Sequence, residues 1–290
     1  MIPHYLRLSL LGIFSCCVGL LDSTAQTPSA KDEANRVVEN AAKIKVDQKA
    51  NPALPTIWLI GDSTVRVGTT GQRGWGDEIA PFFDLDKVNV VNRAIGGRSS
   101  RTFITEGRWD DIVAELQAGD IVIMQFGHND AGVLNEKVLD KSTRARGTIK
   151  GIGEETEEID NILTKKHEVV HTYGWYMRKY VQDTLSKGAT PVVCSLIPRK
   201  TWTPEGKIQR SVNSYAQWAR SVAEQAGVAF VDLNELIATR YEELGREKVE
   251  PLFADAHTHT SVEGARVNAA CVVQGLKALK RNPVEQYLKK

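Results

Sequence analysis

Five apolar runs of strand length constrain the fold of this 290-residue chain more than any other feature. Because polar residues do not alternate regularly within the runs, each strand must be covered on both faces, as in a parallel sheet flanked by helices. Segments with helical periodicity lie between the runs, which predicts a three-layer α/β/α domain with a central parallel sheet of about five strands. The expected strands are TIWLIG (56–61), VNVVNRAI (88–95), DIVIMQFG (120–127), TPVVCSLI (190–197) and VAFVDL (228–233), and the expected helices are GWGDEIAPFF, GRWDDIVAELQ, HTYGWYMRKYVQDTLSKG and SVNSYAQWARSVAEQAG.

Residues 1–25 have the pattern of a secretory signal peptide. A basic residue precedes an apolar segment that is too short to span a bilayer, and the following STA triplet favours cleavage after Ala25. The alternative is a lipid anchor at Cys16, which is disfavoured because the bulky Phe14 stands where that signal needs a small residue. We therefore expect a secreted or periplasmic protein with no membrane segment after cleavage.

Two other segments depart from the alternating pattern. Residues 26–54 are polar and charged, and we interpret them as a linker or N-terminal arm in front of a single domain over residues 55–290. Residues 131–168 form a charged, glycine-containing insertion after the third strand. Because long insertions in compact domains are often functional, we interpret this one as a partly ordered rim that borders the ligand cleft.

Composition argues against several classes of partner. The formal net charge is +1 at pH 7, so no basic excess indicates a nucleic-acid partner. Cys194 and Cys271 lie in apolar stretches, and we expect buried free thiols in preference to a disulfide. No cysteines have the spacing of zinc ligands, so we expect no structural zinc site.

Residues that can carry chemistry follow the first three strands. In open parallel sheets, ligands bind beyond the carboxyl ends of the strands, near the point where the strand order reverses. With the order two-one-three, Ser63 of GDST, Gly97, and Asn129 of GHND become neighbours. Ser63 offers a hydroxyl group, while its own N–H, the N–H of Gly97 and the amide of Asn129 can surround an oxyanion.

The C-terminal string DAHTHTS supplies candidates for a general base. Asp255, His257 and His259 lie in a loop ahead of a helix that Thr260 or Ser261 would cap. A histidine held by a carboxylate is the usual base for a nucleophilic serine, and these roles are recognised by geometry instead of chain order. The pattern predicts an esterase or acyl-transfer site.

Each candidate also has a simpler interpretation. Taken alone, Ser63 is more typical of a helix cap, Asp62 of a residue that fixes the loop, and His128 of a structural hydrogen-bonding residue. A metal site built from His257, His259 and Asp255 is a weak alternative, because no further Cys or His lies close by in sequence.

Four of the tryptophans also have either a structural or a substrate-binding interpretation. Trp75, Trp109 and Trp175 have the positions of core or helix-packing residues. Trp202 lies in the polar loop RKTWTPEGK after the fourth strand, and it is a candidate for stacking on a sugar ring.

Four blocks in the correct order resemble the signature blocks of the SGNH (GDSL-like) hydrolase superfamily. These blocks are GDST, residues 92–97, GHND and the C-terminal loop with Asp and His. The strings GWGDEI, NRAIGGRSSRTF, QFGHND, HTYGWYMRKY and HTHTS are similar to the rhamnogalacturonan acetylesterase branch, and the likeness covers residues 56–279. The resemblance implies a flavodoxin-like SGNH hydrolase fold over residues 55–290.

The resemblance also implies roles for single residues. Ser63 matches the family nucleophile and His259 the catalytic base, while Gly97 and Asn129, with the N–H of Ser63, match the oxyanion hole. His128, Trp202 and His257 are further candidates for substrate binding.

The supporting carboxylate departs from the family pattern. Family members usually place this Asp three residues before the His, where this chain has Ala256, whereas Asp255 stands four residues before His259. We expect a bulged loop in which Asp255 still orients His259, and the alternative is that His257 has taken part of the role.

The resemblance implies a secreted serine esterase that needs no cofactor and removes O-acetyl groups from rhamnogalacturonan, a pectic polysaccharide of the plant cell wall. An esterase for acetylated xylan or for a small acyl ester is one alternative. The displaced Asp motivates another, a catalytically silent carbohydrate-binding protein. The polar, charged insertion favours an acetylated polysaccharide or oligosaccharide over a lipid.

Overall fold

The computed structural model describes Met1 and residues 51–137 and 143–289. Its central sheet is wholly parallel, as predicted, and has the strand order β2-β1-β3-β8-β9, so the two-one-three condition assumed for the site residues is met. The carboxyl ends of β1, β2 and β3 are therefore neighbours. The strands are β1 (Thr56–Gly61), β2 (Asn89–Asn92), β3 (Ile121–Gln125), β8 (Thr190–Cys194) and β9 (Ala229–Val231).

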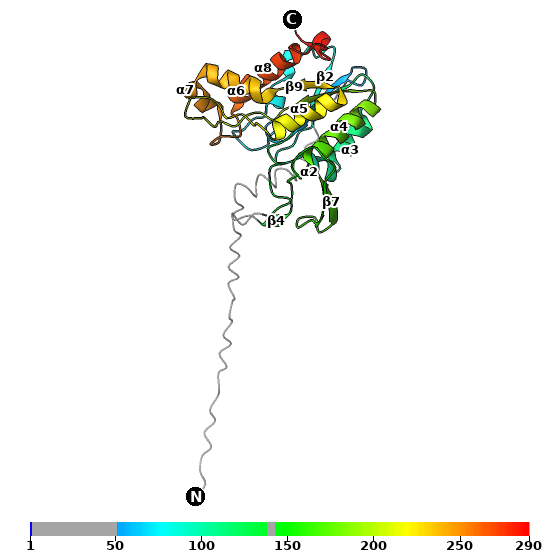
Figure 1. Cartoon of the computed structure of the whole chain (residues 1–290), viewed down its shortest axis with the longest axis vertical. Coiled ribbons are helices and arrows are strands. Elements are labelled where there is room, and N and C mark those ends of the chain that lie inside the picture. Colours follow the sequence, from blue (N-terminus) through cyan, green and yellow to red (C-terminus); the bar gives the residue numbers. More distant parts are fainter. Residues whose placement is uncertain (2–50, 138–142, 290) are drawn as a thin grey trace.

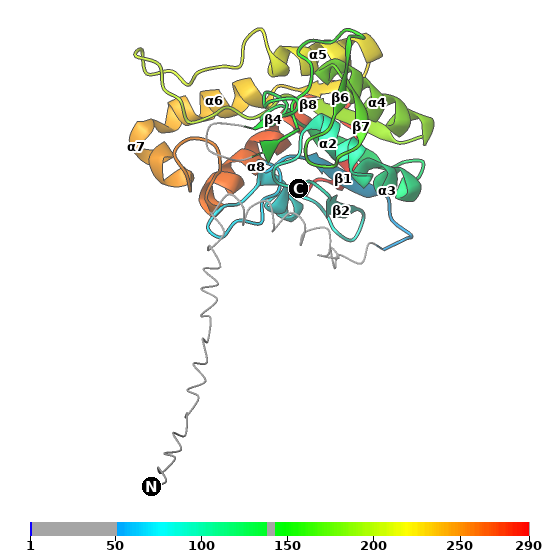
Figure 2. The same cartoon turned by 90° about the horizontal axis from the view of Figure 1, so that it is seen from below.

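Helices cover both faces of the sheet, so the fold is the predicted three-layer α/β/α arrangement (Figures 1 and 2). Alternate residues of β1 point to opposite layers: Ile57 and Leu59 pack in the first layer, whereas Trp58 and Ile60 pack in the second. The first layer contains α6 (Leu233–Leu244), α7 (Arg246–Val249) and α8 (Val262–Lys277), and the second contains α2 (Ser100–Thr105), α3 (Arg108–Glu115), α4 (Tyr173–Ser186) and α5 (Tyr215–Ala226).

The helix expected over GWGDEIAPFF is absent from the structure. Two short 3₁₀ turns replace it, η1 (Trp75–Asp77) and η2 (Ala80–Phe82). Gly76 lies so close to its neighbours that an added Cβ would stand 2.7 Å from the side-chain nitrogen of Asn92, and Pro81 lacks the N–H that a longer helix would use. Helix α6 was also not predicted from the sequence. Two further 3₁₀ turns are η3 (Glu250–Leu252) and η4 (Glu285–Tyr287).

The insertion folds into two small antiparallel hairpins, which project from the body on the side away from the C terminus (Figure 1). They are β4 (Glu136–Lys137) with β5 (Thr143–Arg144), and β6 (Thr156–Asp160) with β7 (His167–His171). Arg101, which is fully buried on α2, bonds Glu168 through Nε at 2.7 Å and so ties the second hairpin to the body.

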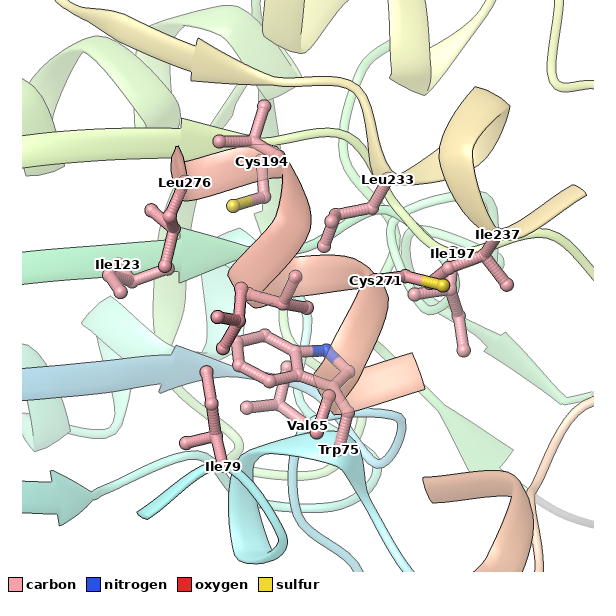
Figure 3. Packing of buried hydrophobic residues seen from close by; sticks show 14 of the residues in the cluster. Val65, Trp75, Ile79, Ile123, Cys194, Ile197, Leu233, Ile237, Cys271 and Leu276 are labelled. Carbon is pink, nitrogen blue, oxygen red and sulfur yellow. The ribbon is translucent and has the colours of Figure 1, made fainter. Parts of the chain in front are cut away.

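Cys194 and Cys271 are buried free thiols, as predicted. Figure 3 shows Cys194 and Cys271 among the apolar side chains that also surround Trp75. Burial raises the pKa of the Cys271 thiol to about 11, which keeps it protonated and unreactive at neutral pH. Trp75 and Trp109 are fully buried, as expected, and Trp175 is half-buried with its ring stacked on His171.

The expected signal peptide and most of the expected arm, residues 1–25 and 26–54, fall outside the described residues, which begin again at Asn51. Within the described part of the chain, no helix has the length and apolar character needed to cross a membrane.

Candidate active site

Ser63 lies in a turn directly after β1, and no helix begins there. The N–H of Val65 donates to the carbonyl oxygen of Asp62 at 3.1 Å and closes the turn. Gly61 is required before the turn, because an added Cβ would stand 2.5 Å from the carbonyl oxygen of Gln125 on the neighbouring strand. The helix-cap interpretation of Ser63 is therefore wrong.

A chain of hydrogen bonds runs from Ser63 through His259 to Asp255. The Nε2 atom of His259 lies 2.9 Å from the Ser63 hydroxyl, and its Nδ1 atom lies 2.5 Å from Oδ2 of Asp255. Ser63 is 8% exposed, while the imidazole and the carboxylate are 25% and 33% exposed. The structure thus brings together three residues that come from opposite ends of the domain.

The loop that carries His259 wraps around the carboxylate of Asp255. Its Oδ1 atom accepts the main-chain N–H groups of His257 at 3.0 Å, Thr258 at 2.7 Å and His259 at 3.0 Å. Burial raises the pKa of Asp255, but these N–H groups and the imidazole outweigh burial and lower the pKa to about 2. The carboxylate is consequently ionised near neutral pH. Because the loop curves around the carboxylate, it accommodates the extra residue between Asp255 and His259.

Three hydrogen-bond donors remain available at the ends of β1, β2 and β3. Among the described residues, the N–H groups of Ser63 and Gly97 have no acceptor. Gly97 adopts φ +79°, a left-handed conformation that glycine tolerates, and an added Cβ on Gly96 would stand 3.5 Å from Cβ of Ser63. The amide of Asn129 donates one hydrogen to the carbonyl oxygen of Arg98 at 3.0 Å, which orients it and leaves the other hydrogen available.

A buried polar network supports the serine turn from below. Trp75 donates to Gln125 at 2.9 Å, Gln125 donates to Thr64 at 2.8 Å, and Thr64 donates to Asp62 at 2.7 Å. Burial raises the pKa of Asp62, but the charge and hydrogen bond of His128, together with Thr64, lower it below the usual range. The expectation that Asp62 fixes the loop agrees with these bonds.

His128 occupies the other end of this network. Its Nδ1 atom lies 3.3 Å from Asp62, and its side chain is 4% exposed. His128 also lines a groove of about 370 Å³ with Arg199, Thr201, Gln209 and Ser211. A larger cavity of about 550 Å³ lies between α6 and α8 and contains none of the candidate residues.

His257 does not approach Ser63. It is exposed, and its Nδ1 atom lies 2.6 Å from the hydroxyl of Thr258 and 3.1 Å from the guanidinium of Arg199. Arg199 therefore connects the groove to the loop that carries His259. In the two described stretches of the domain, no group of three or more His, Cys, Asp or Glu side chains is placed to hold a metal ion.

Trp202 packs partly buried against the core. The guanidinium of Arg246 lies 5.2 Å from the centre of its ring, so this cation covers one face. Trp202 is not among the residues that line the groove. Stacking on a sugar would have to use the remaining part of the ring.

Two charged residues beside the site were not predicted from the sequence. Asp130, at the end of GHND, is 1% exposed and accepts the hydroxyl of Ser100 at 2.5 Å; burial raises its pKa to about 7. Arg146, from the insertion, donates to the carbonyl oxygen of Gly97 at 3.3 Å. Asp130 belongs to the recognised string GHND, which could have identified it. Arg146 lies in the insertion, where no periodic pattern distinguishes one residue from another.

Hydrolysis of carboxylic esters is the chemistry that suits this arrangement, because an imidazole can take the serine proton while free N–H groups receive the negative charge. The site and the parallel sheet together define a hydrolase of the SGNH class. The chain belongs to the GDSL-like Lipase/Acylhydrolase family, whose model matches residues 59–267, and within it to the rhamnogalacturonan acetylesterase-like branch. It is accordingly a carboxylic-ester hydrolase.

Two named relatives support this membership. The chain is 37% identical to the rhamnogalacturonan acetylesterase of Emericella nidulans over 214 residues, which are 74% of this chain and 81% of that protein. It is 30% identical to the probable rhamnogalacturonan acetylesterase YesY of Bacillus subtilis over 240 residues, or 80% of this chain and 97% of the relative.

A solved structure shows the same fold. The crystal structure of YxiM from Bacillus subtilis matches with a TM-score of 0.61 and 25% identity. The match covers 78% of this chain, and this chain spans 56% of the YxiM structure.

Proposed function

We propose that the protein is a secreted serine esterase that removes O-acetyl groups from rhamnogalacturonan of plant cell-wall pectin. The hydrogen-bonded chain from Ser63 through His259 to Asp255 is the observation that carries the catalytic part of this proposal. The named activity of the Emericella relative supports the acetyl ester and the polysaccharide. The signal-peptide pattern of residues 1–25 supports secretion.

Acylation begins when Ser63 Oγ attacks the acetyl carbonyl carbon and His259 Nε2 takes the hydroxyl proton. Asp255 holds the proton of Nδ1, which fixes the tautomer and stabilises the imidazolium that forms. The oxyanion accepts hydrogen bonds from the N–H groups of Ser63 and Gly97 and from the amide of Asn129. His259 then protonates the departing sugar oxygen, and an acetyl ester of Ser63 remains.

Deacylation repeats the same steps with water. His259 removes a proton from the attacking water, and the oxyanion again forms beside the same three hydrogen-bond donors. The proton then passes from His259 to Ser63 Oγ as acetate leaves. Protein side chains, main-chain N–H groups and water supply every proton and hydrogen bond in this sequence.

The groove beside His128 supports a carbohydrate substrate. Its lining is rich in hydroxyl, amide and guanidinium groups, which match the hydroxyl groups of a sugar chain. Because Arg199 joins this groove to the loop that carries His259, a sugar chain bound in the groove would lie against that loop.

Acetate release from a panel of substrates tests the proposal. Wild type and Ser63→Ala are compared on acetylated rhamnogalacturonan, acetylated xylan and p-nitrophenyl acetate. We expect acetate from rhamnogalacturonan at a higher kcat/KM than from xylan, and loss of all three activities in Ser63→Ala. Equal rates for wild type and Ser63→Ala would refute the serine mechanism, and a preference for xylan would refute the assigned substrate.

A further inference from the structure

The side chain of Arg146 lies between the two loops that carry the candidate oxyanion donors. Its main-chain N–H donates to the carbonyl oxygen of Val133 at 3.3 Å, which anchors the residue behind the loop of Asn129. Its Nη1 atom then reaches the carbonyl oxygen of Gly97 at 3.3 Å. An added Cβ on Gly132 would stand 3.7 Å from Cγ of Arg146, so the side chain lies across this loop.

Arg146 forms no salt bridge with a described carboxylate, although the charge of Asp62 acts on it from a greater distance. Arg98, by contrast, pairs with Glu106 at 2.7 Å, and Arg101 pairs with Glu168 at 2.7 Å. Its Nε–H is buried without an acceptor. Burial, together with the charges of Arg144 and Arg98, lowers the pKa of Arg146 to about 10, although the charge of Asp62 acts to raise it.

Arg146 is partly buried, and a guanidinium with an unpaired, desolvated N–H is costly unless an anion compensates its charge. Its planar fork fits a carboxylate with two parallel hydrogen bonds, which a lysine ammonium cannot reproduce. The proposed substrate, as its name states, contains a galacturonic acid, and each such sugar carries a carboxylate. A neutral sugar chain such as a xylose backbone offers no charge at this position.

We propose that Arg146 binds a uronic-acid carboxylate of the substrate next to the acetyl group under attack, and so selects acidic over neutral acetylated polysaccharide. This inference rests on the proposed function, because it specifies the substrate of the same site. It makes Arg146 a specificity-determining residue supplied by the insertion, whose β5 ends two residues earlier.

Steady-state kinetics provide the first test. The ratio of kcat/KM on an acetylated uronic-acid oligosaccharide to kcat/KM on p-nitrophenyl acetate is measured for wild type, Arg146→Gln and Arg146→Lys. We expect the ratio to fall about tenfold or more in Arg146→Gln, the size of a lost charged hydrogen-bond pair, and less in Arg146→Lys. A ratio within about twofold of wild type in Arg146→Gln would overturn the proposal, since a residue that only holds Gly97 slows both esters alike.

Binding without turnover separates this inference from the proposed function. Calorimetry measures the Kd of unacetylated trigalacturonate for Ser63→Ala, Ser63→Ala/Arg146→Gln and a matched control, Ser63→Ala/Arg240→Gln. Arg240 is a half-exposed arginine on α6 that pairs with Glu243 at 3.0 Å. We expect trigalacturonate to bind Ser63→Ala/Arg146→Gln about tenfold or more weakly than Ser63→Ala, and the Arg240 control to bind it like Ser63→Ala. Added salt should weaken the binding of trigalacturonate to Ser63→Ala.

Two results of the calorimetry would contradict the proposal. They are an absence of trigalacturonate binding to Ser63→Ala, and equal Kd values for the parent and the Arg146 variant. If wild type released no acetate from rhamnogalacturonan while trigalacturonate binding still depended on Arg146, the assigned substrate would fail and the anion site would stand.

Discussion

Asp255 stands four residues before His259, and its carboxylate still reaches Nδ1 of that imidazole at 2.5 Å. The second carboxylate oxygen accepts three successive N–H groups of the same loop. The carboxylate thus organises the loop and orients the ring at once. An extra residue between Asp and His is therefore compatible with the geometry that a serine hydrolase needs.

Replacement of Asp255 by Asn should separate the two roles of this carboxylate. The amide oxygen of Asn can still accept the loop N–H groups, so we expect the thermal midpoint to change little. The amide cannot stabilise an imidazolium, so kcat on p-nitrophenyl acetate should fall by roughly 10³- to 10⁴-fold. Asp160→Asn, on the exposed hairpin, serves as the control and should retain wild-type kcat. A near-normal kcat in Asp255→Asn would remove Asp255 from the mechanism.

The two histidines of HTHTS should respond very differently to mutation. His259→Ala removes the only imidazole in contact with Ser63 among the described residues, and we expect a loss of several orders of magnitude in kcat/KM. His257→Ala removes an exposed ring, and we expect a change of no more than about twofold on a small ester. The reverse ranking of these variants would assign the base to His257.

Asn129 should contribute mainly to the transition state. Its free amide hydrogen meets the oxyanion only after attack, so Asn129→Ala should lower kcat by about 10²- to 10³-fold with little change in KM. The comparison uses steady-state kinetics with p-nitrophenyl acetate. A rise in KM at unchanged kcat would show that Asn129 binds the substrate ground state instead.

The buried carboxyl of Asp130 should make stability depend on pH. Its pKa is raised to about 7 in the folded protein, against 3.8 as the ordinary value, so the folded state holds a proton that the unfolded state has lost between these values. The free energy of unfolding should therefore fall as pH rises from about 4 to about 7, on the order of 1 kcal/mol per pH unit, and then level off.

Asp130→Asn provides the comparison for this effect, because the variant cannot titrate. Denaturant unfolding of both proteins across this pH range gives the difference in free energy at each pH. The free energy of unfolding of Asp130→Asn, relative to that of wild type, should rise steadily between pH 4 and 7. A constant difference would show that Asp130 does not hold the extra proton.

The sequence predicted the parallel sheet because β1 and β3 are apolar runs without polar alternation, and such runs need cover on both faces; the strand order was assumed, because it depends on contacts between distant segments. It failed for GWGDEIAPFF, where apolar spacing resembles a helix but tight contacts at Gly76 and the proline favour 3₁₀ turns. The hairpin strands β6 and β7 each bury a single apolar residue, Ile159 and Val170, which is too few to produce a periodic pattern.

The candidate site was predictable to the extent that strand ends and short strings mark it. Ser63, Gly97, Asn129 and His259 all lie in such strings. The position of Arg146 depends on how the insertion folds back over the sheet edge, and local sequence does not encode that path.

Covalent labelling of the serine tests the central claim most directly. The protein is treated with diethyl p-nitrophenyl phosphate, digested, and analysed by mass spectrometry beside a His259→Ala sample. The account predicts one diethylphosphoryl group, on the peptide that contains Ser63, with loss of esterase activity in proportion and far slower labelling in His259→Ala. Complete inactivation with Ser63 unmodified, or a label on another residue, would contradict it.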